Sequence, residues 1–534
     1  MAKIETALIT VADKTGVPEF AARLAALDIG ILATGGTARL LREEGVAVTD
    51  VTDYTGFPEI LDGGLRTLHP KVTGGVLARR EEEKHLRELE ELGIRTIDMV
   101  VVNLFPFVDA ISAPGLELMR AIENIDVAGP TLVRSAAKNY THVAVVTNPE
   151  TYEDIAGELE QNDGSLSEET HFELALEAFR HTAHYDTAIA RYLAGIHGEE
   201  GTALDRLVLE FLKKQDLRYG ENPHQRAALY VEQRVVEASA SASEQIAGPP
   251  PSLNNMLDLD AGIDLAKEFS RPAAVLVKQR NPCGAAVADC LKTAYENAYL
   301  CDPVSAYGCG VVLNRPLNTH AANALVSVEA GSPDAPGEHA VEVLAAPGFD
   351  DEALRVLWEK AEWSKRTRIF QTPPMEWSSV DERAQDMRRV TGGLLVQDRD
   401  LLGFVEESNR VVTEATPSKE EMADLRFAWL CCKHVRSNAV VLARGEMLVG
   451  VGAGQMSRAD AAELAVRKAG ERAEGAALAS DGFLRRADGL ELAARAGVRC
   501  IIQPGGSEDD AAVIGIADRI GLAMVLTGTR HFRH

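Results

Sequence analysis

The strongest constraint on the fold is the alternation of short apolar runs with helical patterns over the first 200 residues. Residues 6–11, 30–33 and 97–103 have the apolar composition of buried strands. Between them, the apolar positions of residues 17–27 and 38–44 recur at helical spacing. Strands that alternate with helices form a parallel sheet covered by helices, so we predict an α/β domain here.

A break near residue 200 predicts the main domain boundary. The helical pattern of residues 169–196 ends at a polar, glycine-rich stretch, residues 198–203. We therefore expect a first domain at 1–198 and a second region at 199–534.

The second region resumes the α/β alternation and predicts two subdomains, at about 205–375 and 385–534. Residues 238–251 are rich in Ala, Ser and Pro and predict a surface loop, and residues 329–340 predict an exposed insertion. In the last third we expect helices at 420–435, 459–469 and 511–519 and strands at 439–443, 448–451, 500–503 and 523–526.

Composition excludes several classes of protein. The 534 residues include 55 Lys and Arg against 81 Asp and Glu, a formal net charge of −26, which repels nucleic acids. No apolar run approaches the roughly 18 residues of a membrane-spanning helix. Seven cysteines without Cys-x-x-Cys pairs or metal-ligand spacing to histidine fit a reducing compartment and predict no metal site. We therefore expect a cytoplasmic protein that acts on small molecules.

One stretch of the second region delivers a lysine at the end of a buried strand. Residues 273–277 are apolar, and Asn281, Pro282 and Gly284 predict that the strand stops just after Lys278. Ligands bind at the carboxyl ends of strands in open α/β sheets, and a lysine there can face a phosphate or a carbonyl oxygen. A solvated lysine at a strand end is the alternative interpretation.

Two stretches of the first domain suggest ligand chemistry. Residues 34–37, Thr-Gly-Gly-Thr, join a predicted strand to a predicted helix, and such a turn presents backbone N–H groups to a phosphate. The two glycines are equally consistent with a turn that needs them only for a positive φ and binds no ligand. Asp126 and Lys138 bracket a Gly-Pro turn that starts a helix. This pair suits proton transfer, although each residue alone is typical of surface charge.

A colinear set of motifs spans the chain. The motifs are DKTG at 13–16, TGGT at 34–37, TLHP at 67–70, NLFPF at 103–107, AAKN at 136–139, RYGENPHQ at 218–225, KQRNPCG at 278–284, DPVSAYG at 302–308, SNA at 437–439, GAGQMSR at 452–458, IQPGGS at 502–507 and RHFRH at 530–534. In this order they resemble the motifs of the bifunctional purine-biosynthesis family PurH.

The resemblance implies a fold and two activities. An N-terminal domain similar to methylglyoxal synthase would act as an IMP cyclohydrolase, and a region of cytidine-deaminase-like subdomains would transfer formyl from 10-formyltetrahydrofolate to AICAR. It also implies a homodimer with transformylase sites at the subunit interface. No metal is expected, because the H-x-E and P-C-x-x-C pattern of true deaminases is absent around Pro282 and Cys283.

The resemblance also implies roles for individual residues. Formyl transfer to a poorly nucleophilic amine needs a base for the proton and a cation for the oxyanion. Lys278 and Asn438 would serve this step, and Asp126 and Lys138 would serve ring closure. The expected substrate-binding residues are Lys14, Thr34, Gly35, Gly36, Thr37, Thr67, Asn103, Arg218, Tyr219, Asn255, Arg458, Ser480, Asp481, Arg530 and His534.

Several ligand-facing motifs depart from the family pattern, while the framework motifs keep it. Gln279 stands at the position of the family's catalytic histidine and cannot accept a proton at neutral pH. Arg66 replaces a lysine implicated in ring closure, and an arginine cannot act as a base. Phe105 lacks the hydroxyl of the family's tyrosine, and residues 480–488 change a wall expected to face the folate.

Three interpretations are consistent with these departures. In the first, both activities survive, and His434, four residues before Asn438, replaces the missing imidazole; packing is the alternative role for His434. In the second, formyl transfer works and ring closure is weak, because closure of a bound intermediate is already intramolecular. In the third, the chain binds purine nucleotides as a regulator without catalysis. Loss of a general base costs roughly 10²–10⁴-fold, which leaves measurable activity.

Overall fold

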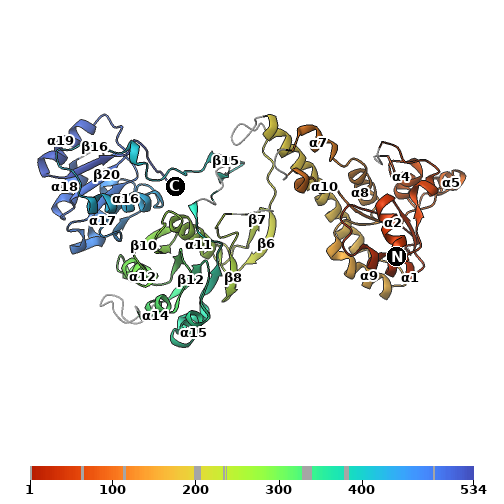
Figure 1. Ribbon diagram of the computed structural model, residues 1–534, viewed down its shortest axis with the longest axis horizontal. Coiled ribbons are helices and arrows are strands. Elements are labelled where there is room, and N and C mark those ends of the chain that lie inside the picture. Colours follow the sequence, from red (N-terminus) through yellow and green to blue (C-terminus); the bar gives the residue numbers. More distant parts are fainter. Residues whose placement is uncertain are drawn as a thin grey trace. The chain divides into compact units, whose positions relative to one another are not determined.

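The computed structural model describes residues 3–61, 65–111, 116–197, 206–232, 235, 237–327, 340–377, 380, 384–484 and 487–534. The chain divides into two compact units, Met1–Val208 and Leu209–His534, which follow one another along the colour bar of Figure 1. The predicted boundary at residue 198, and all but the last residue of the predicted insertion at 329–340, lie outside the described residues. Among the described helices, none combines the length and apolar character that a membrane crossing requires.

The first unit is built on a five-stranded parallel sheet in the order β3-β2-β1-β4-β5. This confirms the parallel α/β sheet predicted from the alternating pattern. The strands are β1 (Thr6–Val11), β2 (Gly30–Ala33), β3 (Thr49–Asp50), β4 (Met99–Asn103) and β5 (Ala144–Val146). The helices are α1 (Val17–Ala26), α2 (Gly35–Glu43), α3 (Val51–Thr55), α4 (Pro70–Leu77), α5 (Glu83–Glu91), α6 (Phe107–Ile111), α7 (Leu118–Glu123), α8 (Ala128–Lys138), α9 (Tyr152–Gln161) and α10 (Glu168–His197).

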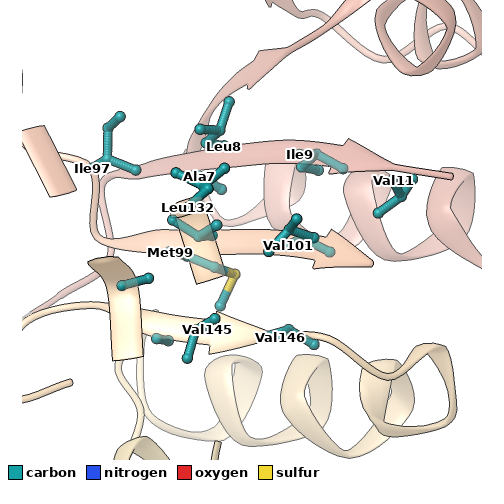
Figure 2. Close-up of a cluster of buried hydrophobic side chains, with 14 of the residues drawn as sticks. Ala7, Leu8, Ile9, Val11, Ile97, Met99, Val101, Leu132, Val145 and Val146 are labelled. Atoms are coloured by element: carbon teal, nitrogen blue, oxygen red, sulfur yellow. The ribbon is translucent and has the colours of Figure 1, made fainter. Parts of the chain in front are cut away.

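The core of the first unit is formed by the central strands. Leu8 and Ile9 of β1 and Met99 and Val101 of β4 are fully buried. Figure 2 shows these side chains packed with residues of β5 and with Leu132 of α8. Because helices cover both faces of a parallel sheet, its strands are apolar without interruption, and this is the pattern that made them recognisable in the sequence.

The second unit contains two six-stranded mixed sheets with the same topology. Their strand orders are β10-β9-β11-β12-β13-β8 and β18-β17-β19-β20-β21-β16. In each sheet, read in this order, the first two pairs of neighbouring strands are antiparallel, the next two are parallel and the last is antiparallel. The strands of the first sheet are β8 (Glu244–Ala247), β9 (Ala273–Lys278), β10 (Asn281–Val287), β11 (Cys309–Leu313), β12 (Val341–Ala346) and β13 (Arg368–Gln371). Those of the second are β16 (Arg410–Val411), β17 (Val440–Ala443), β18 (Leu448–Gly452), β19 (Ala477–Ser480), β20 (Cys500–Gln503) and β21 (Ala523–Leu526).

Helices and two smaller ribbons complete the second unit. The predicted helices of the last third are found within two residues of their expected ends. The helices are α11 (Leu253–Ala266), α12 (Leu291–Tyr299), α13 (Pro303–Ala306), α14 (Thr319–Ser327), α15 (Asp351–Lys360), α16 (Lys419–Lys433), α17 (Arg458–Ala469), α18 (Ala487–Arg495) and α19 (Asp510–Ile520). The two-stranded ribbons are β6 (Leu212–Leu217) with β7 (Ala227–Val231) and β14 (Gln385–Val390) with β15 (Gly393–Asp398).

Both sheets hold their first hairpin with the same device. In the β9–β10 turn, Gln279 and Arg280 have φ of 51° and 64°, and Oδ1 of Asp258 on α11 accepts the N–H of Arg280 at 2.6 Å. In the β17–β18 turn, Glu446 has φ of 52°, and Oδ1 of Asp424 on α16 accepts its N–H at 2.7 Å. A carboxylate on the preceding helix therefore fixes each left-handed turn.

One sequence expectation for the second unit is confirmed and another is wrong. β9 stops at Lys278, as expected, and the turn returns the chain as β10, an edge strand where the missing N–H of Pro282 is tolerated. Residues 238–251 are not a surface loop. Ala238 and Ser243 are buried and Glu244–Ala247 is strand β8, because small side chains let this segment pack closely.

Candidate functional site

In the first unit, cationic side chains gather at the carboxyl ends of β1 and β2. Nζ of Lys14 lies 3.9 Å from the position that a Cβ would take at Gly36. Arg66 lies over Gly35, where a Cβ would be 2.5 Å from Nη1, so only glycine leaves room for the guanidinium. Helix α2 begins at Gly35 and adds the partial positive charge of its N-terminus. This arrangement suits a phosphate.

The same end of the sheet is stiffened by buried polar residues. Asn103, at the end of β4, accepts the N–H groups of Ala12 and Asp13 with Oδ1 at 2.6 and 2.9 Å, and its amide donates to the carbonyl of Asp13. Asn103 thus holds the loop that carries Lys14. The predicted ligand residues that are buried in this unit are Thr34, Thr37, Thr67 and Asn103.

Asp126 and Lys138 lie at opposite ends of α8. Oδ1 of Asp126 accepts the N–H of Gly129 at 2.8 Å, and the N–H of Asp126 donates to the hydroxyl of Tyr185 at 2.8 Å. Lys138 is the last residue of this 11-residue helix and is exposed. At 1.5 Å per residue, the helix separates the two by about 16 Å. The two side chains therefore start from opposite ends of this helix.

In the second unit, Lys278 is the last residue of β9, as predicted, and is half-buried. Its ammonium donates to the carbonyl of Tyr307, in the loop before β11. Nζ of Lys278 and Oε1 of Glu342 each lie 3.9 Å from the position that a Cβ would take at Gly308. Oε2 of Glu342 accepts the amide of Asn255 at 3.0 Å. A carboxylate thus faces the lysine across a glycine.

Further cations lie near Glu342. The guanidinium of Arg218 lies over the ring of Tyr219, 5.7 Å from its centroid. Arg368, on β13, is 8% exposed, and its buried Nε has no hydrogen-bond partner. Burial lowers the pKa of Arg368. The negative charge of Glu342 raises this pKa again, whereas the positive charge of Arg218 lowers it further. Sequence reasoning missed Glu342 and Arg368, because neither lies in a motif that singles it out.

A cavity of about 280 Å³ adjoins Lys278 and the exposed Gln279. Cys283, Asp302 and Lys468 also line it. The ammonium of Lys468, on α17, pairs with the carboxylate of Asp302, so the cavity lies where the two sheets of this unit meet. Burial alone would raise the pKa of Asp302, but its hydrogen bonds with Lys468 and Ser305 lower it overall. The described residues hold no group of three or more His, Cys, Asp or Glu side chains placed to bind a metal ion.

The loop of Asn438 is tied to the turn that follows Lys278. The amide of Asn438 donates to the carbonyls of Gln455 and Met456 at 2.9 and 3.2 Å. Oδ1 of Asn281 accepts the N–H of Arg436 at 2.9 Å. The structure therefore brings the two predicted transformylase residues onto adjoining loops from different sheets.

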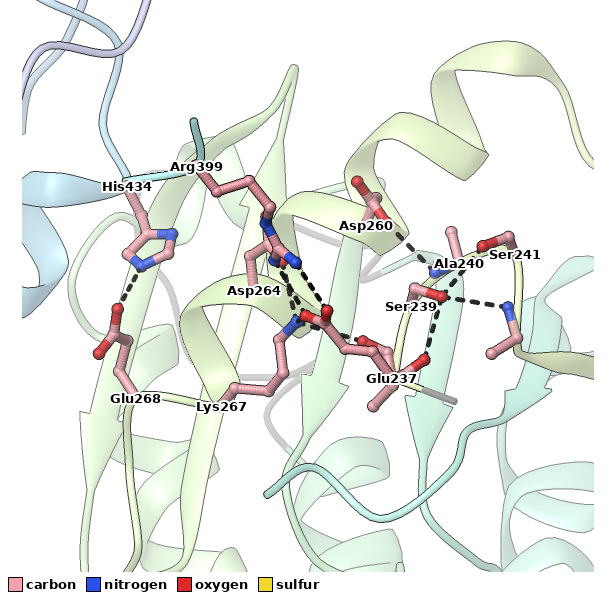
Figure 3. A network of polar contacts seen from close by, with 12 residues as sticks. Glu237, Ser239, Ala240, Ser241, Asp260, Asp264, Lys267, Glu268, Arg399 and His434 are labelled. Carbon is pink, nitrogen blue, oxygen red and sulfur yellow. Dashed lines mark hydrogen bonds and ion pairs between the residues drawn. The ribbon is translucent and has the colours of Figure 1, made fainter. Parts of the chain in front are cut away.

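His434 lies in a buried network of charges (Figure 3). Nδ1 faces Nη1 of Arg533 at 3.0 Å, and because arginine only donates, Nδ1 must accept. Nε2 therefore carries the hydrogen and donates to Oε1 of Glu268 at 2.9 Å. Burial lowers the pKa of His434. The imidazole is neutral, and both of its nitrogens have protein partners.

Arg458 and Asp481 form a partly buried pair beside aromatic rings. Nη2 of Arg458 lies 3.4 Å from Oδ1 of Asp481, and its guanidinium lies 5.8 and 5.3 Å from the ring centroids of Phe483 and Phe532. The buried Nε of Arg458 has no hydrogen-bond partner. Burial raises the pKa of Asp481, which accepts the hydroxyl of Ser437.

The remaining predicted ligand residues surround this pair. The hydroxyl of Ser480 is buried and donates to the carbonyl of Gly482 at 2.8 Å. Arg530 lies over the ring of Phe532, 4.4 Å from its centroid, and the ring of His534 lies 5.9 Å away on an edge. Of the altered segment at 480–488, residues 485 and 486 lie outside the described part of the chain.

Comparisons with known proteins identify both parts of the chain. The profile of the AICARFT/IMPCHase bienzyme family matches residues 136–468, more than half of the chain, and that of the MGS-like domain matches residues 16–131. A solved structure entitled "Crystal structure of ForH" is 39% identical over 35% of this chain and 97% of its own, with a TM-score of 0.32. The predicted fold, an N-terminal MGS-like domain with a parallel sheet followed by mixed α/β sheets, is confirmed. The chain belongs to the AICARFT/IMPCHase bienzyme family, whose activities are the formyltransferase and the cyclohydrolase of purine biosynthesis.

Proposed function

We propose that this chain transfers the formyl group of 10-formyltetrahydrofolate to the 5-amino group of AICAR and then closes the ring to IMP. The observation that carries the proposal is the hydrogen bond of 2.9 Å between Asn281 and Arg436. It joins the turn after Lys278 to the loop of Asn438, so that a cation and an amide adjoin.

The nucleotide binds along the row of groups that leads to Lys278. Arg218 and Arg368 hold the 5′-phosphate, for which the unpartnered Nε of Arg368 is a ready donor. Glu342, fixed by Asn255, then lies between the phosphate and the lysine and accepts hydrogen bonds from the ribose hydroxyls. This order directs the base of the nucleotide toward Lys278.

Formyl transfer proceeds by attack of the amine on the formyl carbon. The carbonyl oxygen becomes negative as the new C–N bond forms, and the ammonium of Lys278 stabilises it. Collapse of the adduct breaks the bond to N10 of the folate. Gln279 accepts a hydrogen bond from the amine but cannot take its proton, so a solvent water takes it, and N10 receives a proton from water as its bond to the formyl carbon breaks. We therefore expect turnover roughly 10²–10⁴-fold slower than with a positioned base.

The folate fits the donors around Arg458. The buried carboxyl of Asp481 suits the amino groups of a pterin, the unpartnered Nε of Arg458 suits an acceptor, and the rings of Phe483 and Phe532 suit its flat face. The bound folate supplies the formyl group and the N10 leaving group.

Ring closure is the weaker of the two activities in this proposal. Lys14, Arg66 and the start of α2 hold the nucleotide phosphate. Nη2 of Arg66 pairs with Oε1 of Glu59 at 2.8 Å, and an arginine in this pair orients a substrate without exchanging protons.

We also propose that the chain works as a homodimer in the cytoplasm. Phe172, Leu176 and Phe179 share one face of α10 and are 55%, 42% and 42% exposed, which suits an apolar contact with a second copy. The seven cysteines are free thiols, which fits a reducing compartment.

The experiment supplies AICAR and 10-formyltetrahydrofolate and follows the release of tetrahydrofolate and the formation of IMP separately. The proposal expects both, with IMP formed more slowly. Tetrahydrofolate without IMP would favour a chain that only transfers formyl. Nucleotide binding with neither product would favour a regulator.

A further inference from the structure

Three arginines meet beside the turn after β9, and none of the roles above uses them. Arg280 lies in the turn itself, Arg436 in the loop that follows α16, and Arg533 near the C-terminus. Oδ1 of Asn281 accepts the N–H of Arg436 at 2.9 Å, and the N–H of Ser437 donates to the carbonyl of Arg533 at 2.8 Å. These two hydrogen bonds from backbone N–H groups hold the three segments together.

The guanidinium groups of this cluster are poorly neutralised. Among the described residues, the side chains of Arg280 and Arg436 make no ion pair or hydrogen bond, and both residues are half-buried. Burial and the charges of Arg280, Arg533 and Arg388 lower the pKa of Arg436 to about 10. Arg388, on β14, pairs with Asp386 at 3.5 Å.

Nearby carboxylates only partly compensate. Asp258 and Asp260 on α11 act on Arg280, but neither lies within the 4.0 Å of an ion pair with it. Asp264 lies 3.5 Å from Arg533, whose other nitrogen faces His434. In a chain with a net charge of −26, a cluster in which Arg280 and Arg436 have no close acidic partner favours a bound anion.

We propose that Arg280, Arg436, Arg533 and Arg388 form an anion site that binds the glutamate carboxylates of the formyl donor. The proposal rests on formyl transfer as the function. Both substrates are anions, and two separate cationic groups adjoin Lys278: Arg218 and Arg368 on the side of Glu342, and this cluster on the side of the turn. Each substrate thus has its own counter-charge, and the two reacting groups meet between them.

The test compares formyl donors that carry one or three glutamates, with the double variant Arg280→Ala/Arg436→Ala. Loss of two charge-assisted contacts should raise KM for the triglutamate donor about tenfold, reduce its advantage over the monoglutamate donor, and leave KM for AICAR unchanged. Arg389→Ala is the matched control, because Arg389 is the exposed neighbour of Arg388 on the same strand. Arg280→Lys/Arg436→Lys keeps the charges and should recover part of the loss.

Equal KM values for both donors in the double variant and in Arg389→Ala would overturn the proposal. Binding of inorganic phosphate that depends on Arg280 and Arg436, without any effect on the folate donors, would also overturn it. Calorimetric binding of pteroyltriglutamate, which does not react, tests the site independently of turnover. If the unchanged chain binds this compound through these arginines but releases no tetrahydrofolate, formyl transfer fails and the anion site stands.

Discussion

Replacing Gln279 with histidine should return the base that this chain lacks and raise the rate of formyl transfer. Gln279 has φ of 51°, a conformation that histidine adopts more readily than most residues. Its side chain is exposed and lines the cavity beside Lys278. The turn itself is held by the hydrogen bond between Asp258 and the N–H of Arg280, which the substitution leaves intact. Gln279→His should therefore fold as the unchanged chain does.

The size of the gain follows from what a base contributes. General base catalysis provides roughly 10²–10⁴-fold, and a histidine in an unoptimised position should recover at least about tenfold in kcat. An imidazole with an ordinary pKa near 6.5 is mostly neutral at pH 7.5 and mostly protonated at pH 5.5. The added rate should thus disappear on acidification, since the protonated ring accepts no proton.

The assay is tetrahydrofolate release at saturating AICAR and 10-formyltetrahydrofolate between pH 5.5 and 8.5. Gln279→Asn is the control, because asparagine also accepts the turn conformation but carries no base. Identical kcat values for Gln279→His and Gln279→Asn across this range would refute the reasoning that the missing imidazole limits the rate.

Three further predictions concern other parts of the chain. Arg66→Lys should speed ring closure of supplied FAICAR and leave formyl transfer unchanged, because lysine can exchange a proton where arginine cannot; unchanged ring closure would contradict this. Lys267→Met should lower the free energy of unfolding by about 3–5 kcal/mol in urea titrations. The side chain of Lys267 is 2% exposed and neutralises Glu237 and Asp264 (Figure 3). A loss below about 1 kcal/mol would contradict this prediction. Burial lowers the pKa of His434 in the folded state, so the unfolded chain binds more protons and the free energy of unfolding should fall as pH drops below about 6.5. His434→Asn should flatten this fall in urea titrations at several pH values. The same pH dependence in the variant and in the unchanged chain would contradict this prediction.

Helical and apolar periodicity predicted the elements that lie wholly in the core. The strands β1 and β4 are mostly apolar and buried because helices cover both faces of their sheet. The same reasoning failed in residues 238–251, and it did not foresee that the chain returns as β10 through Pro282. Local composition marks proline and serine as breakers, whereas an edge strand tolerates proline and close packing favours small side chains such as serine.

The candidate site could be predicted only where its residues lie in motifs. Lys278 was found because it ends a buried strand. Glu342 and Arg368 were missed because they reach the site through the parallel pairing of β12 and β13, far from any motif. The neutral state of His434 depends on Glu268 and Arg533, both more than 90 residues away along the chain, so spacing from Asn438 alone could not reveal it.

The central claim is that Lys278 transfers formyl although Gln279 has replaced the base. The most direct measurement is tetrahydrofolate release from AICAR and 10-formyltetrahydrofolate by the unchanged chain and by Lys278→Met. We predict slow but measurable release by the unchanged chain and a loss of about 100-fold or more in Lys278→Met, since the oxyanion loses its cation. Equal release by the two proteins, or none above the uncatalysed rate in the unchanged chain, would contradict the claim.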